Sequence, residues 1–448
     1  MRIAFVLGLV VLAVPALAAA PQNPPAQQNT PAQQSAPATL VAPPRPAPGA
    51  PPSARITLDE ALRLALQHNH ALQAARSTIL QNQALETTAN IRPNPVLSWD
   101  AQFLPIFEPS KFSSDYIDSQ AQFDLGFAYT FEIGGKRQHR LRAARDVTAA
   151  TRSTVADNER TLSFNVGQQF VATILAQSQI DFTQQDLDSF QKTADISETR
   201  YKAGAISEGD LLKIKLQMLQ FQNDVLSAKL AKIQALSALR QLLGFESVAD
   251  DYDVEGTLEY TPVRAGLDDL KALALGTRPD LRAAQQNVTA AHSAELLAET
   301  NRKRNLTTTF NYSHVASTNT GAFFFNLELP FFDRNQGEVA RTRHVITQDE
   351  QLAAETSQQV LTDVVNAYQN LRTSEQIVQL YQGGYVDQAV KSRDISEYAY
   401  KRGAASLLDY LDAERTYRAN QLAYRQALAT YMTALEQMRQ AVGTRNLP

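Results

Sequence analysis

One unit of the sequence occurs twice. The stretch "DISETRYKAGAISEGDLL" recurs 199 residues later as "DISEYAYKRGAASLLDYL", and aligning residues 195–244 with 394–443 gives 18 identities in 50 positions. A weaker echo lies upstream, where "LDEALRLAL" at Leu58 matches "LDDLKALAL" at Leu267. Self-similarity at this spacing predicts two copies of a structural unit of about 190 to 200 residues.

The N-terminus has a different composition. Its first residues combine one basic side chain, Arg2, with an apolar stretch and small residues at 16 and 18, which is typical of a secretory signal peptide. An uncleaved membrane anchor is the alternative, but Pro15 and the short apolar length weigh against it. Residues 21–52 hold eleven of the 20 prolines and too little apolar surface to offset their ordering entropy. The predicted segments are a signal peptide (1–18), a Pro/Gln/Ala-rich disordered tether (19–53), a first repeat (54–261) and a second repeat (262–448).

Composition excludes several classes of function. The net charge is −4 and Lys and Arg are scattered among acidic residues, so we expect no nucleic-acid partner. The chain has no cysteine, which excludes disulfides, thiolate catalysis, sulfur-ligated zinc and a lipid-modified cysteine anchor. The six histidines show no spacing suited to a shared metal, and no nucleophile motif or phosphate-binding loop is present. We therefore expect no catalytic residue, no metal site and no cofactor.

Each repeat contains a very long stretch without proline. The stretch from Lys136 to Arg200 has 65 residues, which gives a length of roughly 100 Å if it is continuously helical. Residues 336–400 form an equally long stretch in the second repeat. Helices of this length predict a coiled-coil or helical-barrel body. Gly167 and the glycine pair at 383–384 are candidate bends.

A glycine separates two helical runs in each copy. Gly204 and Gly403 lie where the chain is expected to reverse, a position that favours a left-handed backbone. The helix that follows has a seven-residue apolar period, which predicts a packing seam in a supercoil rather than a row of ligand-binding side chains. The seam positions are Leu211, Met218, Val225, Lys232 and Leu239 in the first copy, and Tyr410, Tyr417, Tyr424, Tyr431 and Met438 in the second.

Four segments alternate apolar and polar residues and are predicted strands: 96–103, 119–132, 306–313 and 323–331. The alternation fits a transmembrane β-barrel and, equally, a soluble sheet lying on helices. The signal peptide and the aromatic-rich faces favour the membrane. Because four strands cannot close a barrel and lipid does not tolerate an open sheet edge, membrane strands would require several subunits. With four strands from each subunit, two, three or four subunits would give a barrel of eight, twelve or sixteen strands.

The duplicated turns, "RYKAGAISEGDLL" and "AYKRGAASLLDYLDAER", together with the strand pairs, resemble those of the TolC-like outer membrane efflux protein family. The resemblance covers residues 55–445. The strand-to-helix junction "FEIGGKR" at 131–137 is similar to the CzcC-like, heavy-metal branch, on the strength of that one motif.

The resemblance implies a mainly α fold with a transmembrane β part. Two repeats of helix, two strands and long helical hairpin would form, in a homotrimer, a twelve-stranded outer-membrane β-barrel continued by a periplasmic α-helical barrel. Such a protein is not an enzyme. It passively conducts substrate, here metal cations or small toxic compounds, from an inner-membrane pump and a periplasmic adaptor protein. The alternative function is an exported periplasmic coiled-coil scaffold or adaptor with a small soluble sheet.

The resemblance also implies site residues. The helical tips that dock the adaptor would be Tyr201, Gly204, Ala205, Gly403 and Ala404, and the pore gate would be Asp409, Asp412, Asp210 and Tyr400. The alternative for Asp409 and Asp412 is an ordinary solvated helix face. Ala405 and Gly209 depart from residues that some members use to latch the closed gate, so the latch is expected to differ here, with Lys213 and Arg415 as candidates.

Overall fold

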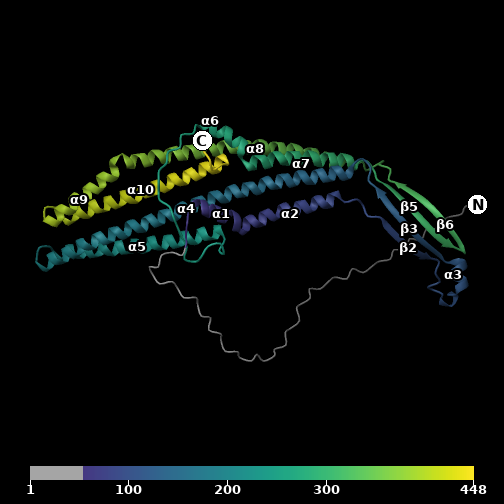
Figure 1. The fold of residues 1–448 in the computed structure, drawn as a ribbon, viewed down its shortest axis with the longest axis horizontal. Coiled ribbons are helices and arrows are strands. Elements are labelled where there is room, and N and C mark those ends of the chain that lie inside the picture. Colours follow the sequence, from purple (N-terminus) through teal and green to yellow (C-terminus); the bar gives the residue numbers. More distant parts are fainter. Residues whose placement is uncertain (1–53, 448) are drawn as a thin grey trace, which may run out of the picture. The chain divides into compact units, whose positions relative to one another are not determined.

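Residues 54–447, which the computed structural model describes, contain two corresponding series of helices and strands (Figure 1). The predicted signal peptide and tether lie outside the described residues. The first series is α1 (Leu58–His68), α2 (His70–Asn90), β2 (Val96–Gln102), α3 (Ser114–Gln120), β3 (Gln122–Phe131), α4 (Lys136–Lys202) and α5 (Glu208–Leu243). The second is α6 (Leu267–Thr277), α7 (Pro279–Asn301), β5 (Leu306–Val315), β6 (Thr318–Leu327), α8 (Gln336–Leu380), α9 (Val386–Arg402) and α10 (Leu407–Val442). The predicted two-repeat organisation is thus confirmed, whereas the segment boundary at 261/262 stays a prediction.

Four strands form one antiparallel sheet in the order β2-β3-β5-β6. The central pair, β3 with β5, joins the two repeats over ten residue pairs. Both edge strands lack a partner in the described part of the chain. A second, two-stranded parallel sheet pairs β1 (Arg55–Ile56) with β4 (Asp253–Val254) beside the helices.

Two predicted strands have different ends in the structure. The strand predicted at 119–132 begins at Gln122, because a short helix, α3, capped by the Ser113 side chain, takes up the preceding residues. The strand predicted at 323–331 is β6, which begins at Thr318 and ends before Pro330. Its start follows from a two-residue hairpin turn in which Ala316 and Ser317 both have positive φ, 49° and 60°. Such turns usually carry Asn or Gly, so the sequence did not reveal this one.

The long helices follow the prediction with one difference. Helix α4 runs for 67 residues without interruption, so the bend expected at Gly167 is wrong. A β-carbon on Gly167 would lie only 2.8 Å from the Glu436 carboxylate, so this glycine allows close packing of α10 instead. The bend expected at 383–384 is confirmed: a π-helical segment (Tyr381–Tyr385) interrupts the second long helix, with Gly384 at φ 113°.

The seven-residue seam forms the helical core. Tyr410, Tyr431 and Met438 are buried on α10, as are Leu211, Val225 and Leu239 on α5. The one polar seam residue, Lys232, forms an ion pair with Asp253 at 2.7 Å between Nζ and the carboxylate oxygen. Helix α5 packs on α4, and α10 packs on α9, α8 and also α4, so the two repeats meet along α4 and α10. In Figure 1 the strands lie at one end of these helices and the turns α4–α5 and α9–α10 at the other.

Candidate functional site

The two helical tips have the same backbone geometry. Gly204 and Gly403 adopt left-handed conformations, with φ of 73° and 78°. After the first helix, Ala205 N donates to Arg200 O at 2.8 Å and Gly204 N donates to Tyr201 O at 2.9 Å. The second tip repeats this pair of hydrogen bonds: Ala404 N donates to the carbonyl oxygen of residue 399, and Gly403 N donates to that of residue 400. The pattern is a Schellman helix end, which requires a residue that tolerates positive φ.

Each tip is followed at once by a capped helix. Ser207 accepts a hydrogen bond from Asp210 N at 3.1 Å, and Ser406 accepts one from Asp409 N at 3.2 Å. At the second tip the Asp409 carboxylate also accepts from Ser406 N at 3.2 Å, which completes a reciprocal capping box. Asp409, one of the predicted gate residues, therefore has a local role in starting α10 and is solvent-exposed.

The candidate latch residues form ion pairs within their own helices. Lys213 Nζ lies 3.6 Å from the Asp210 carboxylate, and Arg415 lies 2.9 Å from that of Asp412. Both are exposed pairs three residues apart, a type that contributes less than about 1 kcal/mol. Within one protomer neither Lys213 nor Arg415 links two helices.

Tyr400 does link the repeats. Its side chain is buried, and its hydroxyl lies 3.3 Å from Ser197 Oγ on α4. Arg200, also on α4, donates to the Tyr400 carbonyl oxygen at 3.0 Å, and the Tyr400 ring stacks on Tyr410 at 5.5 Å between centroids. Tyr201, the equivalent residue of the first tip, is exposed. The predicted gate thus combines one buried tyrosine with three carboxylates near the protein surface.

A buried charge cluster behind the tips was not predicted. Arg418 on α10 forms ion pairs with Asp186 on α4 at 2.5 Å and with Asp224 on α5 at 2.6 Å. Its guanidinium carbon lies 3.9 Å from the centroid of the Phe221 ring. Glu414 is 5% exposed and lies against Asp186. The sequence signal was an acid and an arginine four residues apart beside the tyrosine seam, at positions where the first copy has Lys215 and Leu219.

Burial and the neighbouring Asp186 carboxylate raise the pKa of Glu414 to about 8, and burial raises the pKa of Asp186 as well. The opposing positive charges are Arg393 on α9 and Arg418. Near neutral pH the pair therefore holds one proton, which resides on Glu414. The uncharged Glu414 lets two acids pack against each other without facing like charges.

This arrangement predicts a pH-dependent stability. Glutamate has an ordinary pKa of 4.5, so between about pH 4.5 and 8 the folded protein binds a proton that the unfolded chain has lost. Stability should therefore fall as pH rises through this window and level off above pH 8. Glu414→Gln, which keeps a hydrogen-bond donor and cannot ionise, should remove roughly 1–4 kcal/mol of that decline. Urea unfolding midpoints in detergent at pH 5.5 and 8.5 would measure how much stability is lost between the two pH values. An equal loss in wild type and variant would exclude Glu414 as the source of the pH dependence.

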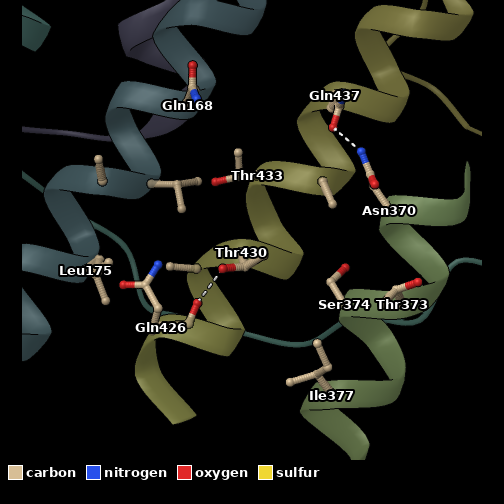
Figure 2. Close-up of a pocket in the computed structure, with 14 residues that line it drawn as sticks. Gln168, Leu175, Asn370, Thr373, Ser374, Ile377, Gln426, Thr430, Thr433 and Gln437 are labelled. Carbon is tan, nitrogen blue, oxygen red and sulfur yellow. Dashed lines mark hydrogen bonds between the residues drawn. The ribbon is translucent and has the colours of Figure 1, made fainter. Parts of the chain in front are cut away.

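One cleft of the helical body is lined only by uncharged side chains. It encloses about 510 Å³ between α4, α8 and α10, and Figure 2 shows its polar side chains, among them Gln168, Asn370, Gln426, Thr430 and Gln437. Asn370 donates to Gln437 at 3.3 Å, and Thr430 donates to the Gln426 carbonyl oxygen at 2.8 Å. None of its lining residues is an acid, a base or a histidine.

Two features are missing from residues 54–447. No three histidine or acidic side chains lie close enough together to hold one metal ion. No helix of this part of the chain is long and apolar enough to cross a membrane.

Comparison with known proteins identifies the fold. The family model described as "Outer membrane efflux protein" matches residues 61–245 and 270–444. The cobalt-zinc-cadmium resistance protein CzcC of Cupriavidus metallidurans is 25% identical over 85% of this chain and 88% of its own. The pyoverdine export outer membrane protein OpmQ of Pseudomonas aeruginosa is 24% identical over 81% and 80%. The crystal structure of the Campylobacter jejuni CmeC outer membrane channel superposes with a TM-score of 0.72 at 17% identity, covering 87% of this chain and 86% of that one. With two family matches that together span most of the described residues, this chain belongs to the outer membrane efflux protein family.

Proposed function

We propose that this chain is one subunit of a homotrimeric exit channel in a tripartite efflux system, which receives substrate from an inner-membrane pump through a periplasmic adaptor protein. Members of the outer membrane efflux protein family are passive channels rather than enzymes, with strands in the outer membrane and helices in the periplasm. The observation that supports a trimer is that the four-stranded sheet has one exposed apolar face and two unpaired edge strands.

That face consists of large side chains from all four strands. Leu97, Trp99, Phe323 and Phe325 are each about 70% exposed. They share a face because residues paired across antiparallel strands point to the same side, as Trp99 and Leu125 do. An exposed aromatic face of this kind suits lipid contact, but lipid cannot satisfy the free backbone groups of β2 and β6. Three copies would supply twelve strands and pair every edge.

The helices give an independent argument for contact between subunits. Helix α5 exposes an apolar stripe on the side away from its own core. The stripe is Leu212, Leu216, Leu219, Leu226, Leu230 and Ile233. Under the 199-residue offset, Leu219 and Leu226 correspond to Arg418 and Arg425, which face α4 in the contact between the repeats. By this internal symmetry the stripe should contact the equivalent of α4, which is α8–α9 of a second copy.

The second long helix presents a matching surface. The same offset pairs Asp186, the partner of Arg418, with Tyr385, which is 59% exposed. Ile395 and Tyr398 on α9 are also exposed. An apolar contact between Leu219 and Tyr385 would thus replace the buried ion pair of the contact within one chain. Such a contact joins two different faces, and it generates a closed ring when the rotation from one subunit to the next closes after a whole number of copies. The unpaired edges of β2 and β6 favour closure after three copies.

The tips and the gate follow from this ring. Six tips would point away from the membrane, and we propose that Tyr201, Gly204, Ala205, Gly403 and Ala404 contact the adaptor protein. Asp409 and Asp412 are exposed beside the second tip, so three copies would form two acidic rings, with Asp210 nearby and Tyr400 positioning the tip. Acidic rings concentrate cations, which favours metal cations over anionic compounds as substrate.

Asparagine at both Asp409 and Asp412 should weaken block of single-channel current by divalent cations added on the tip side. Asparagine is chosen because its side-chain oxygen can still accept from Ser406 N and preserve the cap. Planar bilayers with purified trimers provide the measurement, and Glu208→Gln, which removes a charge from the first tip, is the matched control. Unchanged block at equal insertion would exclude the two aspartates from the gate. A wild-type protein that forms no channel would overturn the proposed function.

A further inference from the structure

The four strands of the large sheet carry almost no charge, and all of it has one sign. In β2, β3, β5 and β6 there is no lysine, arginine or glutamate, and the charged residues are Asp100 and Asp124. The two are directly opposite each other in the β2–β3 pairing. Paired residues of antiparallel strands point to the same face with β-carbons about 5 Å apart, and like charges in such a pair are destabilising.

The hydrogen bonds show that both carboxylates lie on the polar face. Gln102 Nε2 lies 3.5 Å from Asp100 Oδ2 and 3.4 Å from Asp124 Oδ2, so one amide contacts both acids. Gln122 donates to the same oxygen of Asp124 at 2.8 Å. Across the next pairing, Ser313 is directly opposite Asp124 on β5, and Asn311 lies beside it. The acids are therefore surrounded by neutral oxygen and amide groups.

Asp124 has an unused ligand atom. Its side chain is only 8% exposed, and Oδ1 is buried without accepting a hydrogen bond from any described residue. A buried carboxylate oxygen without a donor costs free energy unless something positive approaches it. The single lysine or arginine of the β2–β3 connection, Lys111, forms an ion pair with Glu108. Residues 54–447 therefore provide two carboxylates on one face and form no ion pair with either of them.

We propose that Asp100 and Asp124 form a binding site for a divalent cation on the polar face of the sheet. Carboxylate, hydroxyl and amide oxygens are the ligands that hard divalent cations take, and two carboxylates with neutral oxygens and water suffice for a weak site. The site rests on the proposed function, in which the polar face lines the channel. A trimer then carries six carboxylates at one level near the strand ends remote from the helices, which selects cations at the outer exit.

The test uses trimers in planar bilayers with asymmetric KCl and with CaCl₂ added to one side. Asp100→Asn combined with Asp124→Asn should lower the cation-over-anion permeability ratio about twofold or more and abolish calcium block from the strand side. Asparagine keeps the size of both side chains and the contacts of Gln102. Asp115→Asn removes a charge from α3, at the same end of the protein but outside the sheet, and should leave both readouts unchanged.

Three outcomes would overturn the proposal. They are unchanged selectivity and block in the double variant, an equal effect of Asp115→Asn, and loss of block from the tip side rather than the strand side. If the double variant fails to assemble, Asp100→Asn alone gives the same test, because this side chain is exposed. A wild-type protein without any conductance would remove the proposed function and this site with it, whereas a conducting, unaltered variant removes only the site.

Discussion

Lysine at both Leu219 and Leu226 should abolish the trimer. Each leucine is exposed in the protomer, at 53% and 64%, and belongs to the α5 stripe that we assign to contact with a second copy. Burying a leucine contributes about 1.5–3 kcal/mol, and a lysine in its place must either remain in water or lose its hydration. Because a ring of three subunits contains this contact three times, the effect of the double substitution is multiplied by three.

The assay is the oligomeric state in mild detergent, measured by size-exclusion chromatography with light scattering and by unheated gel electrophoresis. Gln220→Lys is the matched control: Gln220 adjoins Leu219 in sequence, is exposed and lies at least about 40° around the helix from every residue of the stripe. We expect monomers from the double variant and trimers from the control. A stable trimer carrying both lysines would show that α5 faces solvent in the assembly.

Replacing Arg418 with methionine should loosen the helices behind the tips. The substitution leaves Asp186 and Asp224 without their shared partner, and removing one member of a buried ion pair costs about 3–5 kcal/mol. The cost should be smaller at low pH, because protonation of Asp186 then removes part of the uncompensated negative charge. A purely steric effect of the substitution would be independent of pH.

Hydrogen exchange measures this loosening directly. Backbone amides of 186–200 and 407–418 should lose protection in Arg418→Met, while those of the sheet should not change. Arg415→Met is the control on the same helix, since Arg415 is 81% exposed and pairs with Asp412 at the surface. That variant should change protection by less than about 0.5 kcal/mol. Equal protection in both variants would show that the buried cluster does not hold the tips.

Local patterns predicted much of this fold. The seven-residue period predicted the buried seam through Tyr410 and Met438, because a helix repeats its faces within a few residues. The tip glycines were predicted for the same reason, since a Schellman end depends on a single residue of positive φ. Strand alternation predicted the existence of all four strands but not their ends, because the start of β6 depends on a turn at Ala316 that lacks the usual residues.

Features that depend on contacts between distant segments were not predictable. The pairing of β3 with β5 joins residues nearly 200 positions apart. The alternation of apolar and polar residues within a strand does not indicate which other strand it pairs with. The Asp186–Glu414–Arg418 cluster is assembled from α4 and α10, and each residue by itself resembles an ordinary helix-surface charge. The site of Asp100 and Asp124 likewise becomes visible only from the strand register.

The β3–β5 pairing has a consequence for assembly. Because the two paired units belong to one polypeptide, half of the six contacts around the proposed ring form within a chain at a fixed high effective concentration. Ring closure then depends on the third power of subunit concentration, whereas six separate units would require the sixth power. Duplication within one chain thereby lets a dilute, newly exported protein complete its ring before unfinished sheet edges find other partners.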